Sequence, residues 1–141
     1  MSPIVSLNIT HVNELGILNQ QLLEDEGNHK SLSYDYLCQR MSRWLKNRDY
    51  FGFGYIYQNQ LVAYLLACHE DEYCYIRQLV TDREHRRQGY ASKLLNYIEN
   101  HLGTNQQLRL DVLISNKNAM CFYAKRGYNP FYMAMIKTTS P

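Results

Sequence analysis

The order of apolar and polar positions along this chain predicts strands and helices in succession. Apolar residues alternate with polar ones over 5–9, which predicts a short strand, and leucines at helical spacing follow Thr10, which predicts a helix. The polar segment 23–31 contains a glycine and predicts a loop. Ser33 is then a candidate N-cap for a second amphipathic helix, whose apolar face extends to Leu45.

The middle of the chain changes to a period of two, which is typical of strands. Residues 51–57 alternate, residues 61–68 are almost wholly apolar, and residues 73–81 return as a third strand. Short polar turns separate the three segments. We therefore expect an antiparallel meander.

The last part of the chain predicts further alternation of helices and strands. In order, the pattern gives a charged connection over 82–88, a helix over 89–102, a strand over 108–114, a short helix over 116–126 and a last strand over 132–137. Glycines at 103 and 127 end the two helices. A strand joined through a helix to the next strand demands a parallel neighbour. The expected fold class is α/β (α+β), with a mixed, mostly antiparallel sheet, helices on both faces and the order βαα-βββ-α-β-α-β.

Composition narrows the class of protein. The 141 residues suffice for one domain with a single sizeable core. An apolar fraction of 45% with 20% charged residues is typical of a globular protein, and a net charge of +2 indicates no polyanionic partner. The N-terminus lacks the features of a signal peptide, and no apolar run approaches the ~18 residues of a membrane span. We expect a cytoplasmic protein without membrane association.

The cysteines and histidines predict no metal site. Cys38, Cys68, Cys74 and Cys121 are scattered, with no CxxC and no Cys/His pair at metal-ligand spacing. Reduced, buried thiols are the expected state. The five histidines show no clustering.

The segment 78–91 carries the most specific chemical pattern. A strand leads through a basic connection to Gly89 and an amphipathic helix. Backbone N–H groups at such a helix start, together with Arg86 and Arg87, form a cradle that favours phosphate, and a pyrophosphate would fit. A tight turn with solvated arginines is the alternative. The segment has neither the GKS/T ending of a Walker A loop nor the GxGxxG of a dinucleotide site.

Two motifs match a known family. Residues 86–91 (RRQGYA) resemble the R/Q-x-x-G-x-G/A motif of the GCN5-related N-acetyltransferase (GNAT) superfamily, which binds the acetyl-CoA pyrophosphate. Residues 116–128 (NKNAMCFYAKRGY) resemble the N-x-x-A-x-x-F-Y-x-x-x-G-F/Y segment of the same superfamily. The resemblance extends from about Tyr73 to Tyr132, whereas residues 1–50 match only in the order of their elements.

The resemblance implies a single N-acetyltransferase domain over 1–141. Residues 1–50 would be the acceptor-side segment, and residues 51–141 would form the meander and the acetyl-CoA-binding core. The implied reaction transfers acetyl from acetyl-CoA, without a metal, to the primary amine of a small molecule, peptide or protein by direct attack in a ternary complex. A homodimer is a further possibility that the resemblance implies.

The resemblance also assigns site residues by position. The strand end would pair through its backbone with pantetheine, Thr81 standing where the family has valine. Asn116 would contact the pantetheine arm, and Tyr123 would act as the acid near the thioester sulfur. The predicted cofactor-binding residues are Leu79, Val80, Thr81, Arg86, Arg87, Gln88, Gly89, Tyr90, Ala91, Asn116 and Tyr123.

The catalytic base is the weakest part of the match. An amine of pKa ~10.4 is almost wholly protonated at neutral pH, so a base or a desolvating cleft is needed. Many members of the family carry a glutamate on the strand before the L-x-V position, whereas the same-face residues of this chain are Tyr75 and Arg77, next to Gln78, and no carboxylate stands there. Arg77, on a strand expected to be covered on both faces, itself requires a partner.

Three sources of the base are open: a carboxylate from 24–26 or from 70–72, an ordered water, or amine already neutral in solution. Glu24 and Glu26 are the predicted candidates. They lie at the C-terminal end of the first predicted helix, where negative charge is mildly unfavourable, and a cationic amine would offset this cost. The acidic segments also favour a cationic acceptor. Residues 70–72 fit a solvated turn.

Functions of other classes are less well supported. A non-catalytic acyl-CoA-binding or regulatory module is the main alternative, favoured by the missing strand glutamate and disfavoured by Tyr123. Cys121 has no adjacent histidine, so a covalent thiol route has little support. Three arginines, at 83, 86 and 87, and a net charge of +2 provide too little basic surface for nucleic-acid binding. No nucleic-acid partner is expected.

Overall fold

The structure is a computed structural model that describes residues 2–27 and 32–141. The chain divides into two compact units, one up to Leu110 and one from Asp111 to Pro141. Each unit is described by itself. The predicted loop over 23–31 lies in part outside the described residues, and the prediction of a single domain stays a prediction.

The first unit contains a five-stranded sheet in sequence order. Its strands are β1 (Ile4–Ser6), β2 (Tyr50–Tyr57), β3 (Gln60–His69), β4 (Cys74–Thr81) and β5 (Leu108–Leu110). The pairs β1–β2, β2–β3 and β3–β4 are antiparallel, and β5 runs parallel to β4. The meander and the parallel crossover that the sequence predicted are confirmed.

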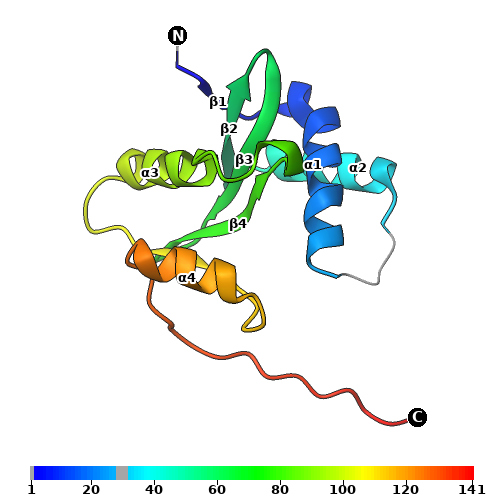
Figure 1. Cartoon of the computed structure of the whole chain (residues 1–141), viewed down its shortest axis with the longest axis vertical. Helices are drawn as coiled ribbons and strands as arrows, with labels where there is room; N and C mark the ends of the chain where they lie inside the picture. Colours follow the sequence, from blue (N-terminus) through cyan, green and yellow to red (C-terminus); the bar gives the residue numbers. More distant parts are fainter. Residues whose placement is uncertain (1, 28–31) are drawn as a thin grey trace. The chain divides into compact units, whose positions relative to one another are not determined.

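Helices cover both faces of this sheet, as predicted. They are α1 (Val12–Asp25), α2 (Tyr34–Lys46) and α3 (Tyr90–Leu102). Figure 1 shows α1 and α2 beside one face and α3 beside the other. The Ser33 side chain accepts a hydrogen bond from the Tyr36 N–H, so the predicted N-cap is confirmed.

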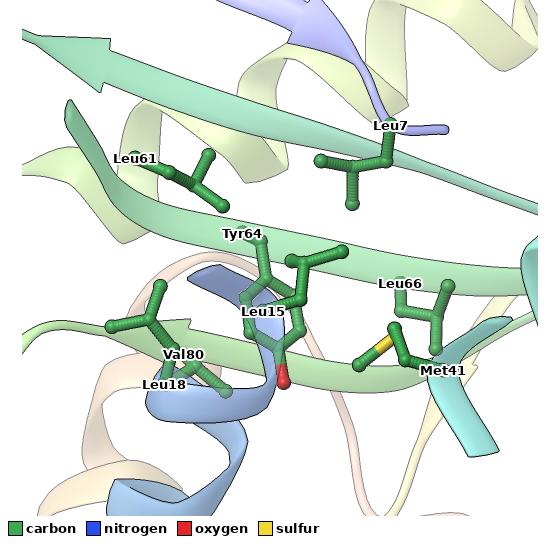
Figure 2. Close-up of a cluster of buried hydrophobic side chains, with 8 residues drawn as sticks. All are labelled: Leu7, Leu15, Leu18, Met41, Leu61, Tyr64, Leu66 and Val80. Atoms are coloured by element: carbon green, nitrogen blue, oxygen red, sulfur yellow. The ribbon is translucent and has the colours of Figure 1, made fainter. Parts of the chain in front are cut away.

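The core follows from the alternation along β3. Tyr64 and Leu66 point to the side of α1 and α2, where they join six further buried residues in Figure 2: Leu7, Leu15, Leu18, Met41, Leu61 and Val80. The Tyr64 ring extends from β3 across β4, with its hydroxyl oxygen at the far end. Residues of the opposite parity, such as Leu65, are fully buried on the other face. A strand covered on both faces reads as a continuous apolar run, which explains the pattern over 61–68.

The second unit is built on one helix, α4 (Lys117–Lys125). Asn116 is its N-cap, accepting a hydrogen bond of 3.1 Å from the Ala119 N–H. Gly127 follows with a φ of +93°, a left-handed conformation that glycine adopts without strain. The helix predicted over 116–126 is confirmed.

Three strand predictions need correction. The last strand, predicted over 132–137, is absent: these residues are described without regular structure, and Met135 and Ile136 are 87% and 96% exposed. The strand predicted over 108–114 ends at Leu110, and the first strand ends at Ser6, because Asn8 caps a 3₁₀ turn over Ile9–His11. Alternation expresses a preference for extended backbone, whereas a strand also requires a neighbour to hydrogen-bond.

Candidate functional site

The end of β4 has an open edge. Only Cys74 to Ile76 pair with β5, whereas β4 continues along β3 as far as Thr81. The register with β3 shifts at Arg77, which has no counterpart and forms a β-bulge. Beyond the bulge, Leu79 and its two successors pair with no second strand among the described residues. Their outward backbone groups can therefore pair with an extended ligand, as the sequence predicted.

The N-terminus of α3 lies just after this strand in the chain. Gly89 is its N-cap, with a φ of +82° and open space within 4 Å of where a Cβ would stand. No side chain caps the helix, and among the described residues the N–H groups of Gln88, Gly89 and Tyr90 donate no backbone hydrogen bond. Unsatisfied N–H groups and the helix dipole together attract an anion. The residues present thus fit the pyrophosphate that the motif implies.

The side chains of the predicted cradle have further partners. Tyr90 is buried, its hydroxyl donates to Gln88 Oε1 at 3.2 Å, and its ring lies 4.5 Å from that of Tyr55. Arg87 is exposed with a φ of +65°, and Ala91 follows in the first turn of the helix. Tyr90 therefore contributes packing through its ring and leaves its backbone N–H for a ligand.

Ion pairs connect the cradle to the C-terminal end of α1. Arg86 pairs with Asp25, and its Nε donates to the Thr81 carbonyl oxygen at 3.2 Å. Arg83 pairs with Glu24 at 2.5 Å and reaches Asp25 at 3.6 Å. The acidic end of α1 and the basic connection, which the sequence placed on opposite sides of a site, compensate each other.

Hydrogen bonds further join the C-terminal half of α1 to the connection that follows β4; we call this contact the junction. Gln21 Nε2 donates to Asp82 Oδ1 at 3.0 Å, and the Arg83 N–H donates to Gln21 Oε1 at 3.0 Å. Asp82 Oδ2 lies 2.8 Å from His85 Nδ1. Partial burial tends to raise the pKa of Asp82, but the hydrogen bonds from Gln21 and His85 outweigh it and lower the pKa below its usual range. Sequence reasoning missed this junction, because the partners are about sixty residues apart.

The two predicted bases have different surroundings. Glu24 is engaged with Arg83, whereas Glu26 forms no ion pair with any residue that the structure describes. Partial removal from water raises the pKa of Glu26, and the charge of Asp25 raises it further. A carboxylate with a raised pKa is better matched to accepting a proton near neutral pH. The structure thus favours Glu26 over Glu24 as a candidate base.

Tyr64, a buried tyrosine to which the sequence analysis gave no role, lies on the side of the sheet that α1 and α2 cover. Tyr64 is fully buried, and its hydroxyl donates to Gln78 Oε1 at 2.8 Å. Burial raises its pKa, which the charge of Arg40 opposes and that of Glu26 reinforces. Gln78, at the position where the family often has an acid, is thereby held by a neutral hydroxyl.

The expectation of a covered Arg77 is wrong. The residue is exposed, and its guanidinium lies over the indole ring of Trp44, 4.8 Å from the centroid. The β-bulge is the physical reason, because the extra residue in β4 falls outside the alternation that buries its neighbours. Arg40, on α2, lies over the same indole at 4.6 Å.

Two predicted residues belong to the second unit. Asn116 caps α4 through its carboxamide oxygen. Tyr123 is half-buried, with its ring 5.3 Å from that of Phe122 and 5.6 Å from that of Tyr128. Burial raises the pKa of Tyr123, so its hydroxyl is protonated at neutral pH. Their predicted contacts to the cosubstrate stay predictions.

Cysteine exposure differs from the expectation at one position. Cys68 and Cys74 are buried, Cys38 is partly buried, and Cys121 is exposed on α4. In residues 2–27 and 32–141, no group of three potential metal ligands comes together. Nor does any helix within those ranges combine the length and apolar character needed to cross a membrane.

Comparison with known proteins gives a family and a fold. The model of the acetyltransferase (GNAT) family matches residues 16–128, which include parts of both units. No curated protein sequence matches significantly.

Three solved structures illustrate the fold. A possible acetyltransferase from Clostridium difficile 630 has a TM-score of 0.80 and 22% identity, covering 98% of this chain and 97% of that one. An aminoglycoside N-acetyltransferase in complex with CoA has a TM-score of 0.77 and 14% identity, covering 96% and 93%. A ribosomal-protein-alanine N-acetyltransferase from Brucella melitensis biovar Abortus 2308 has a TM-score of 0.74 and 13% identity, covering 96% and 98%.

These similarities of sequence are low, so the solved structures show the fold and not the substrate. The family model, in contrast, matches most of the chain, including the open end of β4, the N-terminus of α3 and the helix that carries Tyr123. The chain belongs to the GNAT acetyltransferase family.

Proposed function

We propose that this protein is an acetyl-CoA-dependent N-acetyltransferase that acts on a primary amine in a ternary complex. The observation that carries the proposal is the open edge of β4 at residues 79–81, followed in the chain by the uncapped N-terminus of α3 at Gly89. The amides of the extended pantetheine arm of CoA need an open strand edge to pair with, and its pyrophosphate needs free N–H groups. One structural neighbour is a CoA complex, which supports the choice of donor.

Each part of the donor has a set of residues suited to it. The backbone of Leu79, Val80 and Thr81 would pair with the pantetheine amides. The N–H groups from Arg87 to Ala91 would hold the pyrophosphate, with the Arg86 guanidinium as a further charge. The bound donor supplies an activated acetyl thioester.

The acceptor must reach this thioester as a neutral amine. Glu26, whose pKa is raised, would take a proton from the ammonium form, directly or through water. The amine nitrogen then forms a bond to the acetyl carbonyl carbon while the carbon–sulfur bond breaks with its electron pair on sulfur. The nitrogen loses its surplus proton to solvent. Tyr123, protonated at neutral pH, would donate a hydrogen bond to the leaving sulfur, which takes a proton from the hydroxyl or from solvent.

Two measurements test the proposal: CoA binding by calorimetry, and thiol release from acetyl-CoA across a panel of amines. Gly89→Glu places a negative charge in the cradle and should weaken CoA binding at least about tenfold, since each charge-assisted hydrogen bond contributes about 1.5–3 kcal/mol. Gly103→Glu is the matched control, because Gly103 at the other end of α3 has a φ of +81° and equal open space. Equal CoA affinity in both variants would contradict the cradle.

The alternative is a module that binds acyl-CoA without turnover. One observation favours it: the β4 positions where the family often has a carboxylate hold Arg77 and Gln78, and Gln78 is bonded to Tyr64. CoA binding with no thiol release for any amine would establish this alternative. Structural neighbours named for aminoglycoside and ribosomal-protein-alanine substrates support an amine acceptor in general. Homodimer formation stays an expectation, which the sedimentation of the full chain would test.

A further inference from the structure

We propose that the amine acceptor is a small amino acid whose carboxylate is held by Arg40 and Arg77 at the edge of Trp44. The inference rests on the proposed function and specifies its substrate class. It concerns the side of the sheet that α1 and α2 cover, and all of its residues belong to the first unit.

Both guanidinium groups lie at Trp44 and form no ion pair among the described residues. They lie over the same indole, with their central carbons 4.6 and 4.8 Å from the ring centroid for Arg40 and Arg77. A cation–π contact does not neutralise a guanidinium, whose five N–H donors match a planar, bidentate acceptor such as a carboxylate. Trp44 thus holds the two cations in place without neutralising them.

The surroundings lack the anion that such a cluster requires. Ion pairs among the described residues involve Arg83, Arg86 and His85, and none involves Arg40 or Arg77. Other carboxylates on this side have different neighbours: Glu14 accepts from the Leu61 N–H, Glu26 influences Tyr64, and Glu70 influences Tyr50. None of them pairs with the two arginines in the part of the chain that the structure describes.

A buried pair of polar groups supports a ligand at the same place. Asn19 is fully buried, and its Oδ1 accepts a hydrogen bond of 3.1 Å from Arg40 Nη2. Asn19 Nδ2 and Arg40 Nε are buried donors without an acceptor among residues 2–27 and 32–141. Buried donors without acceptors are costly and rare in folded proteins. A carboxylate is an acceptor-only group that satisfies such donors.

The charges around Arg40 also favour an anionic ligand. Burial lowers the pKa of Arg40; Tyr36 opposes this effect, and the charges of Arg77 and Arg43 add to it. Meanwhile the acidic end of α1 is occupied, because Glu24 and Asp25 pair with the basic connection. The two arginines at Trp44 therefore form a locally positive cluster, contrary to the cationic acceptor that the acidic segments suggested.

The position of Arg77 sets the size of the acceptor. It lies two residues before Leu79, where the open edge of β4 begins, and two residues of a strand span about 7 Å. A molecule that presents its amine beside that edge and its carboxylate to Arg77 needs only a few bonds between the two groups. A small amino acid has this span.

Trp44 gives a direct binding readout, because it is the only tryptophan of the chain. Its fluorescence would be titrated in the presence of CoA with pairs in which the sole carboxylate is replaced by its carboxamide: glycine and glycinamide, L-alanine and L-alaninamide, 4-aminobutanoate and 4-aminobutanamide. In at least one pair, we expect the carboxylate to bind about tenfold tighter or more, in line with a charge-assisted hydrogen bond. Equal binding within every pair, or no binding, would overturn the inference.

Variants connect the preference to the two arginines. Arg77→Gln and Arg40→Gln should each remove the preference, whereas Arg43→Gln, an exposed neighbour on α2, should retain it. Arg77 is exposed, so its replacement keeps the test valid even where Arg40→Gln reduces stability. A preference that survives both replacements would refute the assignment.

Thiol release separates this inference from the proposed function. Turnover of amines with equal kcat/KM for carboxylate and carboxamide would refute the inference and leave the acetyltransferase intact. CoA binding without turnover of any amine would refute the acetyltransferase, while the fluorescence preference still reports on the carboxylate site.

Discussion

Replacing Asp25 by asparagine is expected to tighten CoA binding. Arg86 pairs with Asp25 in the free protein, and a pyrophosphate in the cradle would compete with that carboxylate for the same guanidinium. The substitution removes the competing charge, keeps the shape of the side chain and leaves Arg86 in place. Part of the free energy now used by the ion pair then becomes available to the ligand.

The size of the gain follows from exposure. The Arg86 and Asp25 side chains are 42% and 38% exposed, so solvent and salt screen their interaction. Pairs of this kind contribute about 0.2–1 kcal/mol, which corresponds to an affinity gain of about 1.4- to 5-fold. The gain should shrink with added salt, because the screening length falls from about 10 Å at 0.1 M to about 3 Å at 1 M.

Calorimetric titration of CoA into the two proteins measures the effect. Glu24→Gln is the matched control: it removes the same charge one residue away, but its partner is Arg83. Asp25→Asn should exceed this control at low salt. Unchanged or weaker CoA binding by Asp25→Asn, or an equal gain in both variants, would refute the competition for Arg86.

Three further predictions concern stability and reactivity. Tyr64→Phe should lower the free energy of unfolding by about 1 kcal/mol in urea titrations, because the partly buried Gln78 oxygen loses its donor, and an unchanged midpoint would contradict this. Since the folded state lowers the pKa of Asp82 from 3.8, the stability it confers is complete above that value and is lost as the pH falls through the folded-state pKa. Asp82→Asn should therefore show a shallower acid loss in denaturation curves between about pH 5 and pH 2, and parallel curves would contradict the assignment. Iodoacetamide at pH 8 should label exposed Cys121 in the native protein and spare Cys74, whose pKa burial raises to about 11; mass spectrometry showing equal labelling would argue against this.

Much of the fold could be predicted because local pattern and final structure agree. The meander, the three helices around it and the short helix α4 all appear within a few residues of their predicted limits. At several helix ends an apolar period and a cap or glycine marked the same boundary, as with Ser33 and Gly103. The helix start at Gly89 was predictable for the same reason, since a strand end, a glycine and a helical apolar period follow one another closely in sequence.

The missed elements depend on distant partners. Segment 132–137 has a strand pattern but is described without regular structure, because alternation alone does not supply the hydrogen-bonding partner that a strand requires. Arg77 was expected to be covered, and a bulge that depends on the register against β3 exposes it on Trp44. Such a register is set by pairing across the sheet and cannot be read from β4 alone.

The sequence by itself determined the family, the order of most elements and the helix start at Gly89 where we propose the phosphate cradle, because short-range patterns of period, capping and glycine placement encode them. Tertiary structure decided how the charges are used. It joined Glu24 and Asp25 to Arg83 and Arg86 across about sixty residues, and among the described residues it left Arg40 and Arg77 at Trp44 without an ion pair. The physical reason is that an ion pair depends on distance in space, and folding alone brings such residues within reach or keeps them apart.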